Sequence, residues 1–403
     1  MSNNSDFRAR VLAQLGATDG QVEELLQYNE NTFDQSQALG CAFPIADEPF
    51  VKTWEQYTSE VRESGTINVL GQYLVELRFP ISSGMSFTND YRAATRRGMD
   101  PSQSASAVGL KLRAPEQCQV VLHQTMAGRI PLIIAPVRED FVTMVQAFAK
   151  HNEPAFIPDS MGALMVAGYN NWHRIHGLAQ ALDWDWHSET LWTEYFQYLD
   201  QHKDQYQDRF IILSKGHYSG VPPSDLDLSN DEWEQLSLVI RREHECTHYA
   251  TRRMFSSMRN NLLDELIADF NGIIHASRSF RGDWLLRFFG LESFPNYRRG
   301  GRLENYRGDP CLSDGAFVLL QVIVKRAIEN LERFYCNHAN ELLRPELRPV
   351  VLMTLASYTA EELASDQAST LLSRRFHVLV KALSGAGLPS KLDYEFTQLG
   401  SLS

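Results

Sequence analysis

One stretch, from Ser229 to Met258, predicts a long amphipathic helix and constrains the fold more than any other part of the sequence. Ser229 followed by Glu232 has the spacing of a capping box, so the helix should begin near Asn230. No Pro or Gly follows before Gly272, and the composition stays compatible with a helix to about Met258. One side of this helix should be buried. The side chains that share this side with His244 are Trp233, Leu236, Ile240, His248, Phe255 and Met258.

Two histidines on this buried stripe, His244 and His248, are four residues apart with Glu245 between them. Residues i and i+4 lie on one face of a helix about a turn apart, so both imidazoles can reach one ion. The pattern is H-E-x-x-H, which is typical of zinc sites carried on a helix. It predicts that His244 and His248 bind the metal and that Glu245 faces a bound water as its base.

A second amphipathic helix is expected to begin at Asn261, a good N-cap residue with Asp264 three positions later. Asp264 is better explained by this capping role than as a metal ligand. Glu265 and Asp269 are also four apart and project from one side of the helix. A catalytic zinc needs three protein ligands and an open position, and a histidine ligand usually donates its other N–H to a carboxylate. We therefore expect Glu265 as the third ligand and Asp269 as the partner of one histidine.

The motif pair 244–248 and 265–269 resembles that of the gluzincin metallopeptidases, thermolysin and its relatives. In that family the downstream Glu is the third zinc ligand and the Asp orients a histidine. The resemblance therefore implies a Zn²⁺-dependent hydrolase that acts on a peptide or small amide, with Glu245 and Asp269 as catalytic residues. Two further segments, 160–163 and 170–172, resemble a group of uncharacterised bacterial proteins, which implies no function.

Other interpretations of the same residues stay open. A metal-dependent tailoring enzyme of a biosynthetic pathway could use the same ligands, because fold and ligands do not fix a reaction. A non-catalytic binding protein could carry the two helices only as packed core. Glu245 and His248 also form the E-x-x-H element of ferritin-like iron proteins, but such a bundle needs the element twice, and the sequence has no second copy.

Several His and Tyr residues could stabilise an oxyanion or bind metal elsewhere. Zinc hydrolases need a hydrogen-bond donor beside the developing oxyanion. A second histidine pair, His173 and His176, lies beside Trp172. No Asp or Glu lies at a matching helical spacing to complete a metal site, so a structural role is favoured. The candidates for the oxyanion donor, among which the sequence does not choose, are His217, Tyr218, Tyr249 and His275.

Charge and composition exclude some partners. The 403 residues include 38 Lys and Arg against 50 Asp and Glu, and the net charge of −12 argues against nucleic acid or an anionic membrane as the main partner. The polar start of the chain and the lack of a long apolar run favour a cytoplasmic protein. The five cysteines show no C-x-x-C spacing, so a disulfide framework or a Cys-type zinc site is not expected. The sequence does not fix the oligomeric state.

Short apolar or alternating runs in the middle of the chain predict a small sheet. We expect strands at 119–123, 130–135 and 209–213. The segment 209–217 comes just before the metal helix, where an edge strand could bind an extended peptide by strand addition. A core strand is equally compatible with its sequence.

The whole chain is expected to be a mostly helical α+β protein. In this prediction the small central sheet packs on the metal helix, and helices at both ends complete the shell. Three regions are expected: a helical N-terminal region at 1–100, the metal-site core at 101–290 and a helical C-terminal region at 291–403. The polar segment 296–310, rich in Arg and Gly, is expected to be a long surface loop or lid.

Overall fold

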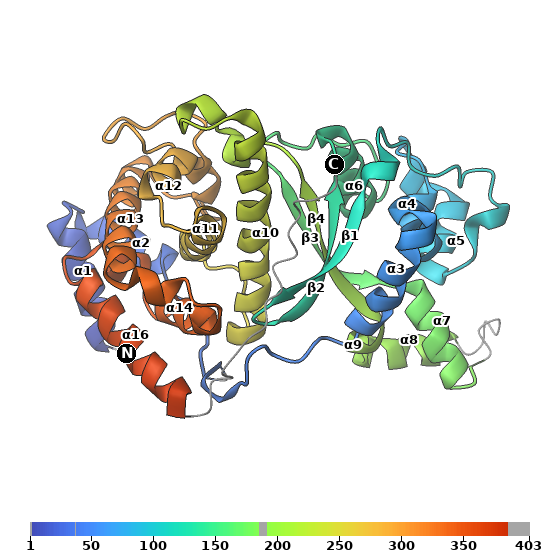
Figure 1. The fold of residues 1–403 in the computed structure, drawn as a ribbon, viewed down its shortest axis with the longest axis horizontal. Coiled ribbons are helices and arrows are strands. Elements are labelled where there is room, and N and C mark those ends of the chain that lie inside the picture. The colour runs from blue at the N-terminus through green and yellow to red at the C-terminus, as the bar shows by residue number, and fades with distance from the viewer. Residues whose placement is uncertain (1, 37, 185–191, 386–403) are drawn as a thin grey trace. The chain divides into compact units, whose positions relative to one another are not determined.

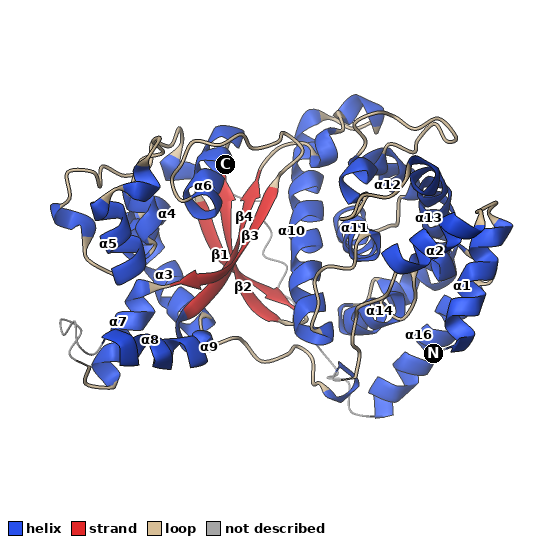
Figure 2. Ribbon diagram, turned by 180° about the vertical axis from the view of Figure 1, so that it is seen from behind, coloured by secondary structure: helices blue, strands red, loops and turns tan. Residues whose placement is uncertain are grey.

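The computed structural model describes residues 2–36, 38–184 and 192–385. These residues are mostly helical, with helices at both ends and a four-stranded mixed sheet from the middle of the chain (Figure 1, Figure 2), so the predicted α+β fold class is confirmed. The chain forms two units, Met1–Ala46 with Val221–Ser403, and Asp47–Gly220. The three regions expected from the sequence have other boundaries than these two units, and they stay a prediction. The packing of the sheet on the helix that carries His244 and His248 also stays a prediction. Among the described residues, no helix is both long and apolar enough to cross a membrane.

The sheet belongs to the unit Asp47–Gly220. Its strands are β1 (Gln119–Thr125), β2 (Gly128–Ala135), β3 (Ala163–Asn170) and β4 (Gln207–Ser214), in the order β1-β2-β4-β3. β1 and β2 form a tight antiparallel hairpin, β2 runs parallel to β4, and β3 runs antiparallel to β4. Three of the four strands were therefore expected from the sequence.

The position of β4 in the sheet decides between the two interpretations of the segment 209–217. β4 lies between β2 and β3, so it is a core strand and the edge-strand interpretation is wrong. The two edges are formed by β1 and by β3, and the sequence did not predict β3. Most side chains of β3 are only half-buried or exposed, and Gly168, at φ 72°, interrupts the strand where its register with β4 shifts. The alternation that marks a strand is therefore broken.

Two helices of this unit cover one face of the sheet. α3 (Val51–Ser64) and α6 (Arg138–Lys150) pack on the face that carries Phe210 and Ile212. The remaining helices of the unit are α4 (Thr66–Tyr73), α5 (Asn89–Arg97), α7 (Trp172–Ala181), α8 (Trp192–Gln201) and α9 (Lys203–Tyr206).

The other unit contains the two helices that carry the motif residues, and both were expected from the sequence. α10 (Asn230–Phe255) begins at the predicted residue, where the Ser229 hydroxyl accepts the backbone N–H of Glu232 at 3.3 Å. α11 (Leu262–Ser277) follows directly. The other helices are α1 (Ser2–Gln14), α2 (Asp19–Tyr28), α12 (Gly282–Phe289), α13 (Asp314–Leu342), α14 (Arg348–Leu355), α15 (Ala360–Ala364) and α16 (Ala368–Gly385).

α10 and α11 lie side by side, and a glycine allows their close approach (Figure 1). A Cβ atom on Gly272 of α11 would lie 2.8 Å from the carbonyl oxygen of Ile240 on α10, closer than Cβ atoms come to backbone atoms. Gly272 therefore allows the two helices to approach closely enough for their polar side chains to meet.

We expect Gly272→Ala to lower the free energy of unfolding by about 1–3 kcal/mol, because the new methyl group forces α10 and α11 apart. Gly177→Ala in α7 is the matched control, since its Cβ would meet nothing within 4 Å. This control should stabilise the protein by about 0.5–1 kcal/mol through helix propensity. Chemical denaturation measures both changes, and a neutral or stabilising effect of Gly272→Ala would contradict the close packing.

Candidate metal centre

The two histidines of the H-E-x-x-H motif turn toward one point. His244 and His248 are each 7% exposed, and their Nε2 atoms lie 3.1 Å apart. The ring planes are inclined by 77°, with centroids 4.7 Å apart. The one-turn spacing on α10 therefore brings the two nitrogen atoms together as the sequence predicted.

Glu265 on α11 completes a group of three donors. Its Oε2 lies 3.5 Å from His244 Nε2, and its Oε1 lies 3.5 Å from His248 Nε2. Zinc bonds of about 2.0–2.2 Å in a tetrahedral site place neighbouring donor atoms roughly 3.3–3.5 Å apart. The three distances are close to this separation, so a small divalent metal fits between these side chains.

Asp269 orients one of the histidines, as expected. Its Oδ1 lies 2.9 Å from His244 Nδ1, and its side chain is fully buried. The carboxylate keeps the proton on Nδ1 and leaves the Nε2 lone pair for a metal. The other oxygen of Asp269 accepts a hydrogen bond from the Arg302 guanidinium, which lies 5.1 Å above the ring of Phe289.

The segment 296–310 supplies two residues that the sequence did not identify. A short 3-10 helix, Arg302–Tyr306, carries Arg302 to Asp269, and the Tyr306 hydroxyl donates to Glu265 Oε2 at 2.6 Å. Leu303 is fully buried, so the interpretation of this segment as only a surface loop or lid is wrong for its middle part. The only sequence signal for this turn is the spacing of Arg302, Leu303 and Tyr306, which suits one helical turn with an inward side. The signal is weak because the surrounding residues are polar.

Glu245 lies on the same helix as the two histidines and is half-buried. Its negative charge acts on both His244 and His248 and favours their protonated forms, although for His244 burial outweighs this effect. Within the described part of the chain, Glu245 makes no hydrogen bond or ion pair. This carboxylate is therefore available to bind and transfer a proton.

Burial and neighbouring charges determine which of these side chains carry a proton. Burial lowers the pKa of His244 to about 4, so its imidazole is neutral. Burial also acts to lower the pKa of His248, but the hydrogen bond and charge of Glu265 outweigh it and raise that pKa to about 9. For Glu265, burial is outweighed by the hydrogen bond and charges of the histidines, and its pKa falls well below its usual value. A metal must therefore displace a proton from His248.

Asp264 does not form the capping box with Asn261 that the sequence predicted, and it bonds instead to the residue before the N-cap. Its Oδ1 accepts the backbone N–H of Asn260 at 3.0 Å, while its Oδ2 lies 3.8 Å from His248 Nδ1, beyond hydrogen-bond distance. Burial raises the pKa of this carboxyl to about 6. Asn261 is the N-cap residue, but its side chain makes no capping bond.

Of the four predicted oxyanion donors, His275 and Tyr249 belong to the same unit as these ligands. His275 lies ten residues after Glu265 on α11, about 15 Å along the helix axis. The Tyr249 side chain is fully buried, and its hydroxyl lies 3.5 Å from an Arg253 nitrogen. His217 and Tyr218 belong to the unit Asp47–Gly220, so their role stays a prediction.

We expect Asp269→Ala to weaken divalent-metal affinity by about 10–100-fold, because His244 loses the partner that fixes its ring and tautomer. Asp231→Ala, an exposed position in the first turn of α10, should leave the affinity unchanged. Competition with a chromophoric zinc chelator measures both constants. Equal affinities for the two variants would show that Asp269 does not support a metal ligand.

Comparison with known proteins adds a family but no activity. A model described as "Family of unknown function (DUF7005)" matches residues 10–367. No curated protein and no solved structure matches the chain.

Proposed function

The chain belongs to this family of unknown function, and from the geometry of its metal centre we propose that it is a zinc-dependent hydrolase acting on a peptide or small amide bond. One observation carries the proposal. His244, His248 and Glu265 place three donor groups 3.1–3.5 Å apart around one point, with Asp269 behind His244.

The donor set suits zinc better than a hard cation. Two imidazole nitrogens and one carboxylate are the ligands of many catalytic zinc sites, whereas Mg²⁺ and Ca²⁺ prefer sites made only of oxygen atoms. Cys246 on α10 is a buried thiol, and burial raises its pKa well above the usual value, so a thiolate ligand is not supported.

Zinc held by these three side chains would act as a Lewis acid and would lower the pKa of a coordinated water to about 7. Glu245 is the proton carrier in this proposal. Its unpaired, half-buried carboxylate accepts the proton of the attacking water and returns it to the leaving nitrogen of the amide.

The other buried residues position the ligands. Arg302 neutralises Asp269, which holds the His244 ring in one orientation, and the Tyr306 hydroxyl fixes Oε2 of Glu265. Ligands with restrained side chains lose less conformational freedom when a metal binds. The short helix Arg302–Tyr306 is therefore part of the centre and not only a cover.

We expect about one zinc per chain in protein purified without chelator, and less than a tenth of that in His244→Ala, which removes one of three ligands. His275→Ala on α11 is the control, because this histidine lies outside the donor group and should leave the zinc content unchanged. Elemental analysis by plasma mass spectrometry measures the ratio. Absence of zinc from the unmutated protein, even after incubation with zinc, would exclude the proposal.

Glu245→Gln should retain zinc and lower turnover by about 10²–10⁴-fold, because the glutamine side chain cannot accept the proton of the attacking water. Glu234→Gln, on an exposed position of the same helix, should keep full activity. Cleavage of quenched peptide libraries and of small amides supplies the assay. Full activity of Glu245→Gln would refute its role as base, and zinc without hydrolysis of either substrate class would favour a tailoring or binding function.

A further inference from the structure

A second group of metal-binding side chains lies where α13 and α16 pack together, in the same unit as the candidate centre on α10 and α11. Among the described residues, His338, Glu341 and His377 each offer one donor atom, and these atoms all lie within 4.8 Å of one another. The group shares no residue with the candidate centre. Its binding chemistry is therefore separate from that of the H-E-x-x-H motif.

His338 is the fixed member of this group. The side chain is 7% exposed and packs against the rings of Phe334 and Phe376, whose centroids lie 5.1 and 5.2 Å from its own. Its Nε2 lies 2.9 Å from the hydroxyl oxygen of Ser373, and its Nδ1 lies 2.9 Å from Oε2 of Glu341. One ring nitrogen is thus held by a hydroxyl while the other faces a carboxylate, an arrangement that suits a histidine metal ligand.

Glu341 and His377 are the adjustable members of the group. Glu341 follows His338 by three residues, about one helical turn, and its side chain is 42% exposed. His377 is exposed on α16, one turn after Ser373, and its ring centroid lies 5.2 Å from that of His338. Within the described part of the chain, the His377 imidazole makes no hydrogen bond or ion pair. Both side chains can therefore turn toward one ion.

The separations indicate a lower affinity than at the candidate centre. Neighbouring donors of a tetrahedral zinc lie roughly 3.3–3.5 Å apart, so some donors of this group must move by about 1 Å to bind one ion. Exposed side chains can move this far by changing rotamers, but they then lose conformational entropy. Zinc must therefore be supplied to fill the group.

From this juxtaposition we propose that His338, Glu341 and His377 bind a second zinc ion, which links α13 to α16. The metal replaces the proton on Nδ1 of His338, which passes to solvent, and Nε2 then donates its N–H to the Ser373 hydroxyl. Two imidazoles and one carboxylate suit Zn²⁺, whereas Mg²⁺ and Ca²⁺ prefer sites made of oxygen atoms. The proposal does not depend on hydrolysis at the other centre.

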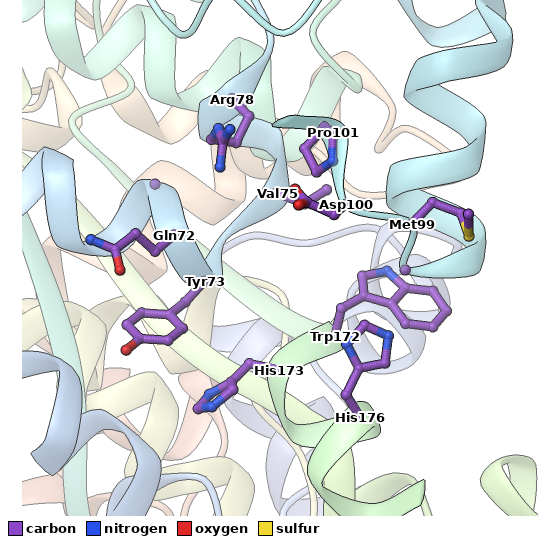
Figure 3. A pocket seen from close by; sticks show the side chains of 12 residues that line it. Gln72, Tyr73, Val75, Arg78, Met99, Asp100, Pro101, Trp172, His173 and His176 are labelled. Atoms are coloured by element: carbon purple, nitrogen blue, oxygen red, sulfur yellow. The ribbon is translucent and has the colours of Figure 1, made fainter. Parts of the chain in front are cut away.

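The histidine pair of α7 belongs to no such group and supplies a control. His173 and His176 line a pocket of about 220 Å³ in the unit Asp47–Gly220 (Figure 3). Nδ1 of His173 lies 2.9 Å from the Tyr57 hydroxyl, and neither histidine belongs to a group of three metal donors in the described chain. The structural role expected for this pair stays a prediction.

Calorimetric titration of the full chain with zinc tests the proposal. Protein loaded with one equivalent of zinc should bind about one further equivalent at free zinc concentrations up to about 0.1 mM. Mg²⁺ at about tenfold higher concentration should not displace this zinc, because it does not favour imidazole ligands. The second equivalent should also raise the midpoint of thermal unfolding, since a ligand that binds only the folded state stabilises it.

Variants assign the second equivalent to its ligands. His377→Ala should weaken it at least about tenfold and abolish its effect on the unfolding midpoint, because one of three ligands is lost. This substitution should not disturb folding, since His377 is exposed and makes no hydrogen bond in the described chain. Glu341→Gln should weaken the second equivalent by a similar factor, because a neutral amide replaces the carboxylate ligand.

Two further variants separate this site from other zinc binding. His176→Ala removes an exposed histidine of α7 and should leave both equivalents unchanged. His244→Ala should remove the tighter equivalent and leave the weaker one, so that failure of either zinc site can be recognised separately. An unchanged circular dichroism spectrum verifies that each variant is folded.

Three results would overturn the proposal. The first is no zinc binding beyond the equivalent that His244→Ala removes. The second is a second equivalent that folded His377→Ala binds as tightly as the unmutated chain does. The third is loss of the second equivalent in His176→Ala or its displacement by Mg²⁺, since other surface groups would then hold the ion.

Discussion

Charge pairing among buried groups of α10, α11 and the helix Arg302–Tyr306 is the constraint on which the candidate metal centre depends. Protonated His248 faces Glu265, and Arg302 faces Asp269, so each buried charge has a partner of opposite sign. A divalent ion that displaces the His248 proton adds one net positive charge, and nearby Glu245 offsets it. The pairing stabilises these charges without metal, because isolated charges at this burial would be strongly unfavourable. In the proposed zinc-bound state the same carboxylates would balance the charge of the ion.

The local part of this centre could be predicted, because helix periodicity determines it. His244 and His248 lie one turn apart, as do Glu265 and Asp269, so helix geometry alone places each pair on one face. Gly272, which allows the two faces to meet, carries no local signal of that role. Arg302 and Tyr306 could not be predicted, because they reach the centre through tertiary packing of a polar segment without clear periodicity.

The sheet shows the same division between local and long-range information. β1, β2 and most of β4 have continuous or alternating apolar residues, and their positions were expected. β3 has exposed side chains and a glycine at its register shift, so only its pairing with β4 marks it as a strand. Without β3, the core position of β4 could not be inferred. Hydrogen bonds likewise connect Asp208 of β4 through Asn171 and Tyr57 to His173 of α7. Tyr57, Asn171 and Asp208 are far apart in the sequence, so their spacing does not predict the contacts.

X-ray absorption at the zinc edge tests the central claim most directly, because it reports the atoms around the bound metal. The proposed site predicts two imidazole nitrogens at about 2.0–2.1 Å and carboxylate or water oxygens at about 2.0–2.2 Å, in four- or five-fold coordination. A sulfur neighbour at about 2.3 Å would place the metal on a cysteine instead. A spectrum with that sulfur shell, or with a single imidazole, would contradict the convergence of His244, His248 and Glu265 on one ion.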